Sequence, residues 1–188
     1  PYADLAPVPV AEPIKLVHSG ACQRKRHLEI MLEAVQDSNA NVTLDLFITP
    51  NDPAYLQELK DRYSADPRVT FNDPVPYADL IPTLNKFDVG VFVLPPATFS
   101  YKWALPNKFF EYVMAGLALC VSDLPEMTRL VRAHGLGETI DRAEPASIAA
   151  ALARFDRAAV EASKRASLAA ARELCWEAEA GKLLDLAA

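Results

Sequence analysis

Short apolar runs alternate with amphipathic segments along most of the chain. Between the apolar runs, hydrophobic residues recur at helical spacing, as in Leu28, Met31, Leu32 and Val35. The runs themselves have the length and β-branched content of buried strands, and they cover residues 14–19, 42–49, 68–71, 88–94, 117–122 and 138–140. This alternation predicts an α/β fold: a doubly wound, Rossmann-like parallel sheet of about six strands with helices between them.

The two ends of the chain differ from this pattern. Residues 1–13 are rich in proline and predict an extended linker, which suggests that something precedes it; residues 14–188 form the predicted domain. After Asp156 the chain is alanine-rich and predicts helix to the end, with an interruption near Cys175 and Trp176. We expect Trp176 in the core. We expect the basic residues of this tail on a solvated face rather than on a membrane; they are Arg157, Lys164, Arg165 and Arg172.

Composition excludes several functions. A formal net charge of −6 argues against nucleic-acid binding. The three cysteines include no CxxC pair, and the three histidines lie on separate segments, so a metal site or any other cofactor is not expected. No apolar run is long enough to span a membrane, and the first residues do not resemble a signal peptide. A cytoplasmic location is the expectation.

Two segments at the predicted carboxyl ends of strands could bind an anion. Gly20 to Arg26 (GACQRKR) joins a glycine to three basic residues before a predicted helix, which suits a pyrophosphate, although a solvated basic turn has the same composition. In the second segment Pro106 suits a first helical turn, which puts Asn107 and Lys108 at its positive end. Glu111 follows one turn later and could accept both hydroxyls of a ribose, or be an ordinary surface glutamate.

The second segment also carries a family resemblance. PNKFFEYVMAG, followed after a short strand by SDLPE, resembles the C-terminal, nucleotide-sugar-binding domain of group 1, or family 4-like, glycosyltransferases of the GT-B fold. Ile14 to Gly20 resembles the first strand and glycine loop of that domain, and RVTFNDPVPY (68–77) resembles its third strand and base-side loop. Cys175-Trp-Glu, Ala178 and Lys182-Leu-Leu resemble its closing helix. The likeness covers nearly the whole chain from Ile14.

The resemblance implies a set of donor-binding residues. Gly20 would give the donor diphosphate room, and Arg26 would neutralise its charge. Asn107 and Lys108 would lie close to the phosphates or the donor sugar, and Glu111 would hold the ribose. The loop that flanks the base would contain Val75 and Pro76. Arg26 and Lys108 would also support catalysis by stabilising the leaving diphosphate, without a metal.

The chain departs from the family pattern at several positions. The commoner form of the family has a further glutamate eight residues before the ribose-binding one, where this chain has Trp103. The chain resembles a PNK-type subgroup that handles the sugar differently, so the identity of the donor sugar is left open. Phe99, Tyr101 and Trp103 could form a stacking wall beside the donor or the interdomain cleft, or simply pack within their loop. Ala118 replaces a common proline and Cys175 a common serine. His18 is expected at the end of the first strand as a packed histidine.

The function that the resemblance implies is recognition of a nucleoside diphosphate sugar for glycosyl transfer. The acceptor would be held by an N-terminal domain that this chain lacks, so the chain alone is expected to bind nucleotide without transferring sugar. Any peripheral membrane contact would be made through that missing half. Two alternatives stay open: a non-catalytic GT-B-like interaction or regulatory module, and half of a sugar-nucleotide epimerase.

Overall fold

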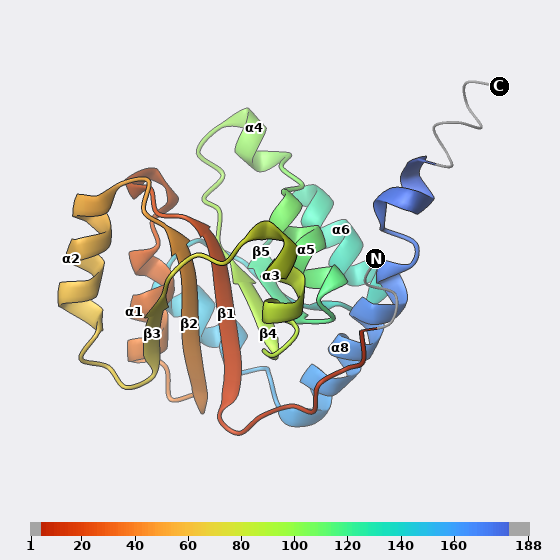
Figure 1. Ribbon diagram of the computed structural model, residues 1–188, viewed down its shortest axis with the longest axis horizontal. Coiled ribbons are helices and arrows are strands. Elements are labelled where there is room, and N and C mark those ends of the chain that lie inside the picture. Colours follow the sequence, from red (N-terminus) through yellow and green to blue (C-terminus); the bar gives the residue numbers. More distant parts are fainter. Residues whose placement is uncertain (1–4, 181–188) are drawn as a thin grey trace.

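The computed structural model describes residues 5–180 and contains one six-stranded, fully parallel sheet (Figure 1). Its strands are β1 (Ile14–Ala21), β2 (Val42–Thr49), β3 (Val69–Asn72), β4 (Val89–Phe92), β5 (Ala118–Ser122) and β6 (Gly137–Ile140). They lie in the order β3-β2-β1-β4-β5-β6, the doubly wound Rossmann order. All six predicted strands and the predicted fold class are therefore confirmed.

Helices follow every strand. They are α1 (Glu29–Asp37), α2 (Pro53–Tyr63), α3 (Tyr77–Leu84), α4 (Phe99–Lys102), α5 (Asn107–Met114), α6 (Pro125–His134), α7 (Pro145–Leu152) and α8 (Arg157–Ala171), with a short 3-10 helix η1 (Arg24–Arg26) before α1. Local signals fix several of their ends. The Asp52 side chain accepts a hydrogen bond from the Tyr55 amide at the start of α2, and Gly135 ends α6 in the left-handed conformation.

The sheet separates two hydrophobic cores, because successive strand residues point to opposite faces. Leu16, Val91 and Cys120 pack with α1, α2 and α7 on one face. Val17, Phe92 and Leu119 pack with α3, α5 and α6 on the other, where Ala170 of α8 also contributes. Helices thus cover both faces of the central strands. The carboxyl edge of the sheet remains available to form a site.

A buried ion pair attaches α8 to the sheet. Lys164 Nζ lies 3.0 Å from Asp88 Oδ1 and donates a hydrogen bond of 2.7 Å to the Phe87 carbonyl; the two charged side chains are only 1% and 2% exposed. Asp88 Oδ2 accepts hydrogen bonds from the backbone amides of Ala11 and Lys15. The prediction that Lys164 lies on a solvated face is therefore wrong: its charge is buried because Asp88 is there to pair with it.

The predicted interruption near Cys175 is confirmed. The chain leaves α8 through a turn and becomes helical again at Trp176. The expectation that Trp176 lies in the core is wrong, since its side chain is 73% exposed. Lys182-Leu-Leu, part of the family resemblance, lies outside the described residues. Within the described residues, every helix is too short or too polar to cross a bilayer.

Candidate functional site

The carboxyl ends of β1 and β4 meet where the strand order reverses, the place at which doubly wound sheets bind ligands. Gly20 lies at the end of β1 with φ of +148°, a conformation that favours glycine. A Cβ atom placed on Gly20 would overlap Nζ of Lys108, the second residue of α5. The structure therefore brings together two of the predicted site residues that are far apart in sequence.

The ammonium of Lys108 lies in a partly enclosed, charged environment. Its Nζ is 5.8 Å from the centroid of the Phe92 ring, a cation–π distance. Burial lowers the pKa of Lys108, while the Glu111 carboxylate raises this pKa and the Arg26 guanidinium lowers it. Because these charges act on one another, Lys108, Glu111 and Arg26 belong to a single site.

The three basic residues of the first loop have different environments. Arg26 ends η1 with its guanidinium 5.7 Å from the centroid of the Tyr101 ring, on α4. Arg24 instead forms two hydrogen bonds of 2.8 and 2.9 Å with Glu58 of α2. The sequence suggested one basic cluster around the loop, but Arg24 is removed from it because Glu58 neutralises its charge. Arg26 is the residue that faces Lys108.

Glu111 lies one turn into α5 and is half-buried. Burial raises the pKa of its carboxyl group, and Lys108 partly opposes this effect. No hydrogen-bond donor within residues 5–180 reaches this carboxylate. A half-buried carboxylate without such a donor is costly, and it is available to accept hydroxyl donors from a ligand.

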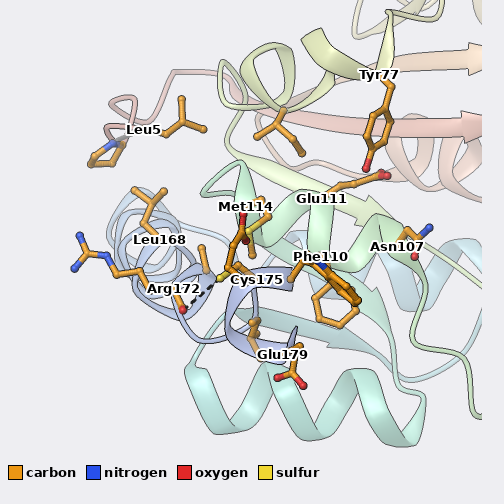
Figure 2. A pocket seen from close by; sticks show the side chains of 16 residues that line it. Leu5, Tyr77, Asn107, Phe110, Glu111, Met114, Leu168, Arg172, Cys175 and Glu179 are labelled. Atoms are coloured by element: carbon orange, nitrogen blue, oxygen red, sulfur yellow. Dashed lines mark hydrogen bonds between the residues drawn. The ribbon is translucent and has the colours of Figure 1, made fainter. Parts of the chain in front are cut away.

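A cavity of about 1050 Å³ opens beside Glu111 (Figure 2). Asn107 and Glu111 of α5 and Tyr77 of α3 line one part of it. Apolar side chains line much of the rest, namely Leu5, Pro7, Ile81, Phe110, Met114, Leu168, Ala171, Leu174 and Trp176, and the segment after α8 adds Arg172, Cys175, Glu177 and Glu179. Val75 and Pro76 do not line the cavity themselves. Pro76 is the N-cap residue of α3, so both lie directly before Tyr77 at its rim.

Two buried side chains, Tyr112 and His18, hold this edge of the sheet together, and the sequence did not single out Tyr112. The Tyr112 hydroxyl accepts a hydrogen bond from the Ser19 amide (3.2 Å) and donates one to the Val91 carbonyl (3.3 Å), so it connects β1 to β4. His18 Nδ1 lies 2.9 Å from the same carbonyl. The position of Tyr112, three residues after Phe109 in an apolar stripe, was the available signal, since this spacing continues the buried face of α5.

The His18 imidazole confirms that the basic groups converge. Burial lowers its pKa to about 3, with a further lowering by Lys108 and a smaller one by Arg26, against the raising effect of the Val91 hydrogen bond. His18 is therefore neutral at neutral pH, and its Nδ1 carries the proton donated to Val91. It is a packed histidine, as expected from the sequence, and it lies beneath the charged site.

The aromatic residues after β4 divide between the two expected roles. The rings of Phe99 and Trp103 lie 6.3 Å apart and both are exposed, while Lys102 Nζ lies 5.7 Å from the Trp103 ring. Tyr101 is only partly exposed and contacts Arg26. Tyr101 thus forms part of the site wall, whereas Phe99 and Trp103 pack on each other at the surface of α4.

Comparison with known families gives a match over most of the chain. The family described as "Glycosyl transferases group 1" matches residues 13–156, a range that contains Gly20, Arg26, Lys108 and Glu111. A comparison with curated protein sequences finds no match.

Solved structures share the fold. Sucrose-phosphate synthase from Thermosynechococcus elongatus is 18% identical with a TM-score of 0.75, and the superposed region covers 95% of this chain and 45% of the synthase chain. A pneumococcal O-GlcNAc transferase, solved with UDP and GlcNAc, is 15% identical with a TM-score of 0.64, covering 87% and 33%. HepE from Anabaena, solved with UDP-glucose, is 17% identical with a TM-score of 0.59, covering 85% and 44%. The chain therefore spans less than half the length of these proteins.

Proposed function

Because the chain belongs to the group 1 glycosyl transferase family, we propose that it is the donor-binding half of a GT-B glycosyltransferase and binds a nucleoside diphosphate sugar. The observation that carries the proposal is the convergence of Arg26, Lys108 and Glu111 on the open edge of the sheet beside Gly20. Two cations with an adjacent carboxylate match a diphosphate joined to a ribose.

The diphosphate would lie between the two helix ends of the site. Gly20 allows the backbone to approach closely, since any side chain there would occupy the space of Lys108. The amides of Asn107 and Lys108 at the start of α5 are free of intrahelical partners and carry the positive end of the helix dipole. Arg26 supplies the second full charge from the opposite side.

The ribose and base would lie along α5 toward the cavity. Glu111 would accept the two ribose hydroxyls, which would give its carboxylate the hydrogen bonds that residues 5–180 do not provide. Val75 and Pro76 would flank the base at the rim. Asn107 would lie between the phosphates and the donor sugar.

In the reaction, the bond between the anomeric carbon and the diphosphate oxygen breaks, and a bond forms from the anomeric carbon to the oxygen of an acceptor hydroxyl, whose proton would pass to a base of the acceptor-binding half. The developing negative charge on the leaving diphosphate would be stabilised by Arg26, Lys108 and the α5 dipole, so the proposal requires no metal or other cofactor. The acceptor would be bound by an N-terminal domain. The chain by itself would bind nucleotide and show no transfer.

Calorimetric titration of the 188-residue chain with UDP, GDP and ADP tests the proposal. We expect saturable binding of at least one of them, weakened roughly 10- to 100-fold by Arg26→Ala and by Glu111→Ala, because each removes a charge-assisted interaction. Arg24→Ala is the matched control: it removes the same charge from the same turn, but from a residue already paired with Glu58. Equal losses for the two arginine variants, or no binding of any nucleotide, would reject the proposal.

One observation favours the alternative of a non-catalytic module. Trp103 occupies the position of the family's sugar-contacting glutamate and is exposed beside Phe99. A module of this kind would bind none of the three nucleotides. The epimerase alternative is separated by incubating the protein that contains both domains with a donor alone, since epimerisation needs no acceptor.

A further inference from the structure

Tyr77 has a large aromatic side chain that the fold leaves in solvent. It is the first residue of α3, and its side chain is 78% exposed. Within residues 5–180 its hydroxyl makes no hydrogen bond and its ring faces no other ring or cation. The Tyr77 ring lines the wall of the cavity, so its exposed surface is available to contact a ligand bound there.

The position of Tyr77 relates it to Glu111. Figure 2 shows the Tyr77 side chain extending from α3 with its hydroxyl end toward the Glu111 side chain on α5, while Asn107 lies farther along α5. A ligand whose sugar hydroxyls bind Glu111 would therefore have its neighbouring group beside the Tyr77 ring. In a nucleoside that neighbouring group is the base, which is planar.

The loop before Tyr77 has few groups that could read the edge of a base. Pro74 and Pro76 have no amide hydrogen, so Val75 is the sole amide donor of residues 74–76, and it makes no backbone hydrogen bond to any residue that the structure describes. One donor provides little of the affinity for a base. Stacking on an aromatic face needs no particular edge pattern and would supply the rest.

We propose that the Tyr77 ring is the stacking platform for the nucleobase, and thus the residue that makes this site prefer a nucleoside diphosphate over a plain diphosphate. The inference rests on the proposed function. Phe110 and Trp176 are the other aromatic residues that line the cavity among the described residues. Phe110 is half-buried and packs edge-on against Phe109 with ring centroids 5.7 Å apart, and Trp176 lies beyond α8 and not on the base-side loop. Tyr77 has its ring faces free.

The experiment compares UDP with inorganic pyrophosphate, which has the charged part of the ligand but no base. Both are titrated into the wild-type chain, Tyr77→Ala and Tyr77→Phe, with GDP and ADP in place of UDP if either binds more tightly. We expect Tyr77→Ala to weaken nucleotide binding about 5- to 150-fold, the range for loss of one base–aromatic stack, and to leave pyrophosphate binding unchanged. Tyr77→Phe keeps the ring and should retain nucleotide affinity within about twofold.

Other outcomes of these titrations separate a failure of this inference from a failure of the proposed function. If Arg26→Ala weakens both ligands while Tyr77→Ala weakens neither, the donor site stands and the stacking role of Tyr77 is wrong. If Tyr77→Ala weakens UDP and pyrophosphate equally, Tyr77 acts on the shape of the site and not on the base, which also rejects the inference. If the wild-type chain binds no nucleotide, both proposals fail. Thermal unfolding of each variant checks the fold, which an exposed side chain should not affect.

Discussion

Lys108 on α5 extends its ammonium group to the backbone of Gly20 at the end of β1, into the space that a side chain on Gly20 would occupy. The contact joins the end of a strand to the start of a helix, across 88 residues of sequence from 20 to 108. It makes the position of the ammonium depend on the absence of a Cβ atom. The absence of a side chain on Gly20 therefore allows the Lys108 ammonium to occupy this position.

Gly20→Ala is the direct test of this contact. The added methyl group would displace Lys108 and strain a backbone with φ of +148°, so we expect nucleotide affinity to fall at least tenfold and stability to fall by about 1–3 kcal/mol. Gly135→Ala is the control: it shares a positive φ (+65°) but has no atom within 4 Å of the new Cβ. It should lose stability and keep its affinity in calorimetry. An equal loss of affinity in both variants would mean that strain alone is responsible.

We expect the Glu111 carboxylate to lower the stability of the ligand-free protein and to strengthen the binding of nucleotide. Its pKa is raised in the folded state, so folding favours the protonated form and the carboxylate contributes instability above its unfolded pKa. We expect Glu111→Gln to raise the thermal midpoint at pH 7 by a few degrees at most, an advantage that disappears as the pH falls below about 4. The same variant should bind nucleotide more weakly. Melting curves at pH 7 and pH 4 measure the first effect, and an unchanged midpoint at pH 7 would contradict it.

His18 should make the protein sensitive to acid. Its pKa is lowered from 6.5 to about 3 on folding, so the unfolded chain binds a proton that the folded chain does not. The stability that His18 contributes is complete above pH 6.5 and is lost as the pH falls toward 3, at up to about 1.4 kcal/mol per pH unit. His18→Gln should reduce the slope of unfolding free energy against pH between 6 and 4 by nearly one proton. His134→Gln is the control, since His134 lies at the partly exposed end of α6. This substitution should reduce the slope less than His18→Gln does.

The Lys164–Asp88 pair should dominate the attachment of α8. Lys164→Met leaves the Asp88 carboxylate buried without its cation, and we expect a loss of about 3–5 kcal/mol in urea unfolding. Arg165→Met is the control, since Arg165 is exposed on the same helix and its loss should change stability by no more than about 0.5 kcal/mol. Adding Asp88→Asn to Lys164→Met should recover part of the loss, because the buried negative charge is then absent. No recovery would indicate that packing, and not charge, is lost.

Local patterns predicted the strands well because their physical cause is local. A buried strand such as Ala118–Ser122 is predicted by its continuous apolar run, and the segment PNKFFEYVMAG predicts α5. Local patterns did not predict the ion pairing of Arg24 and Lys164 or the solvent exposure of Trp176. Arg24 is neutralised by Glu58, 34 residues away, and Lys164 by Asp88, 76 residues away, so tertiary pairing decides whether each charge meets solvent.

The residues of the candidate site also fall into those that the sequence predicted and those that it did not. The sequence and its resemblance identified Gly20, Arg26, Lys108 and Glu111, and the structure brings these four together. It did not identify Tyr112, whose hydroxyl is buried between Ser19 and Val91, because an apolar stripe does not reveal which of its aromatic residues carries a polar partner. The resemblance placed Tyr77 at the end of the base-side segment, but the sequence did not predict that its ring is exposed, because exposure is a property of the folded surface.

The carboxylate of Asp88 has a mechanical consequence. It holds the amides of Ala11 and Lys15, near the start of the described chain, and the ammonium of Lys164, near its end. The segment that enters the sheet and the helix that leaves it are thereby clamped to one point and must move as a single rigid body. If a second domain is joined ahead of this one and swings to open and close the cleft, its pivot lies upstream of Ala11.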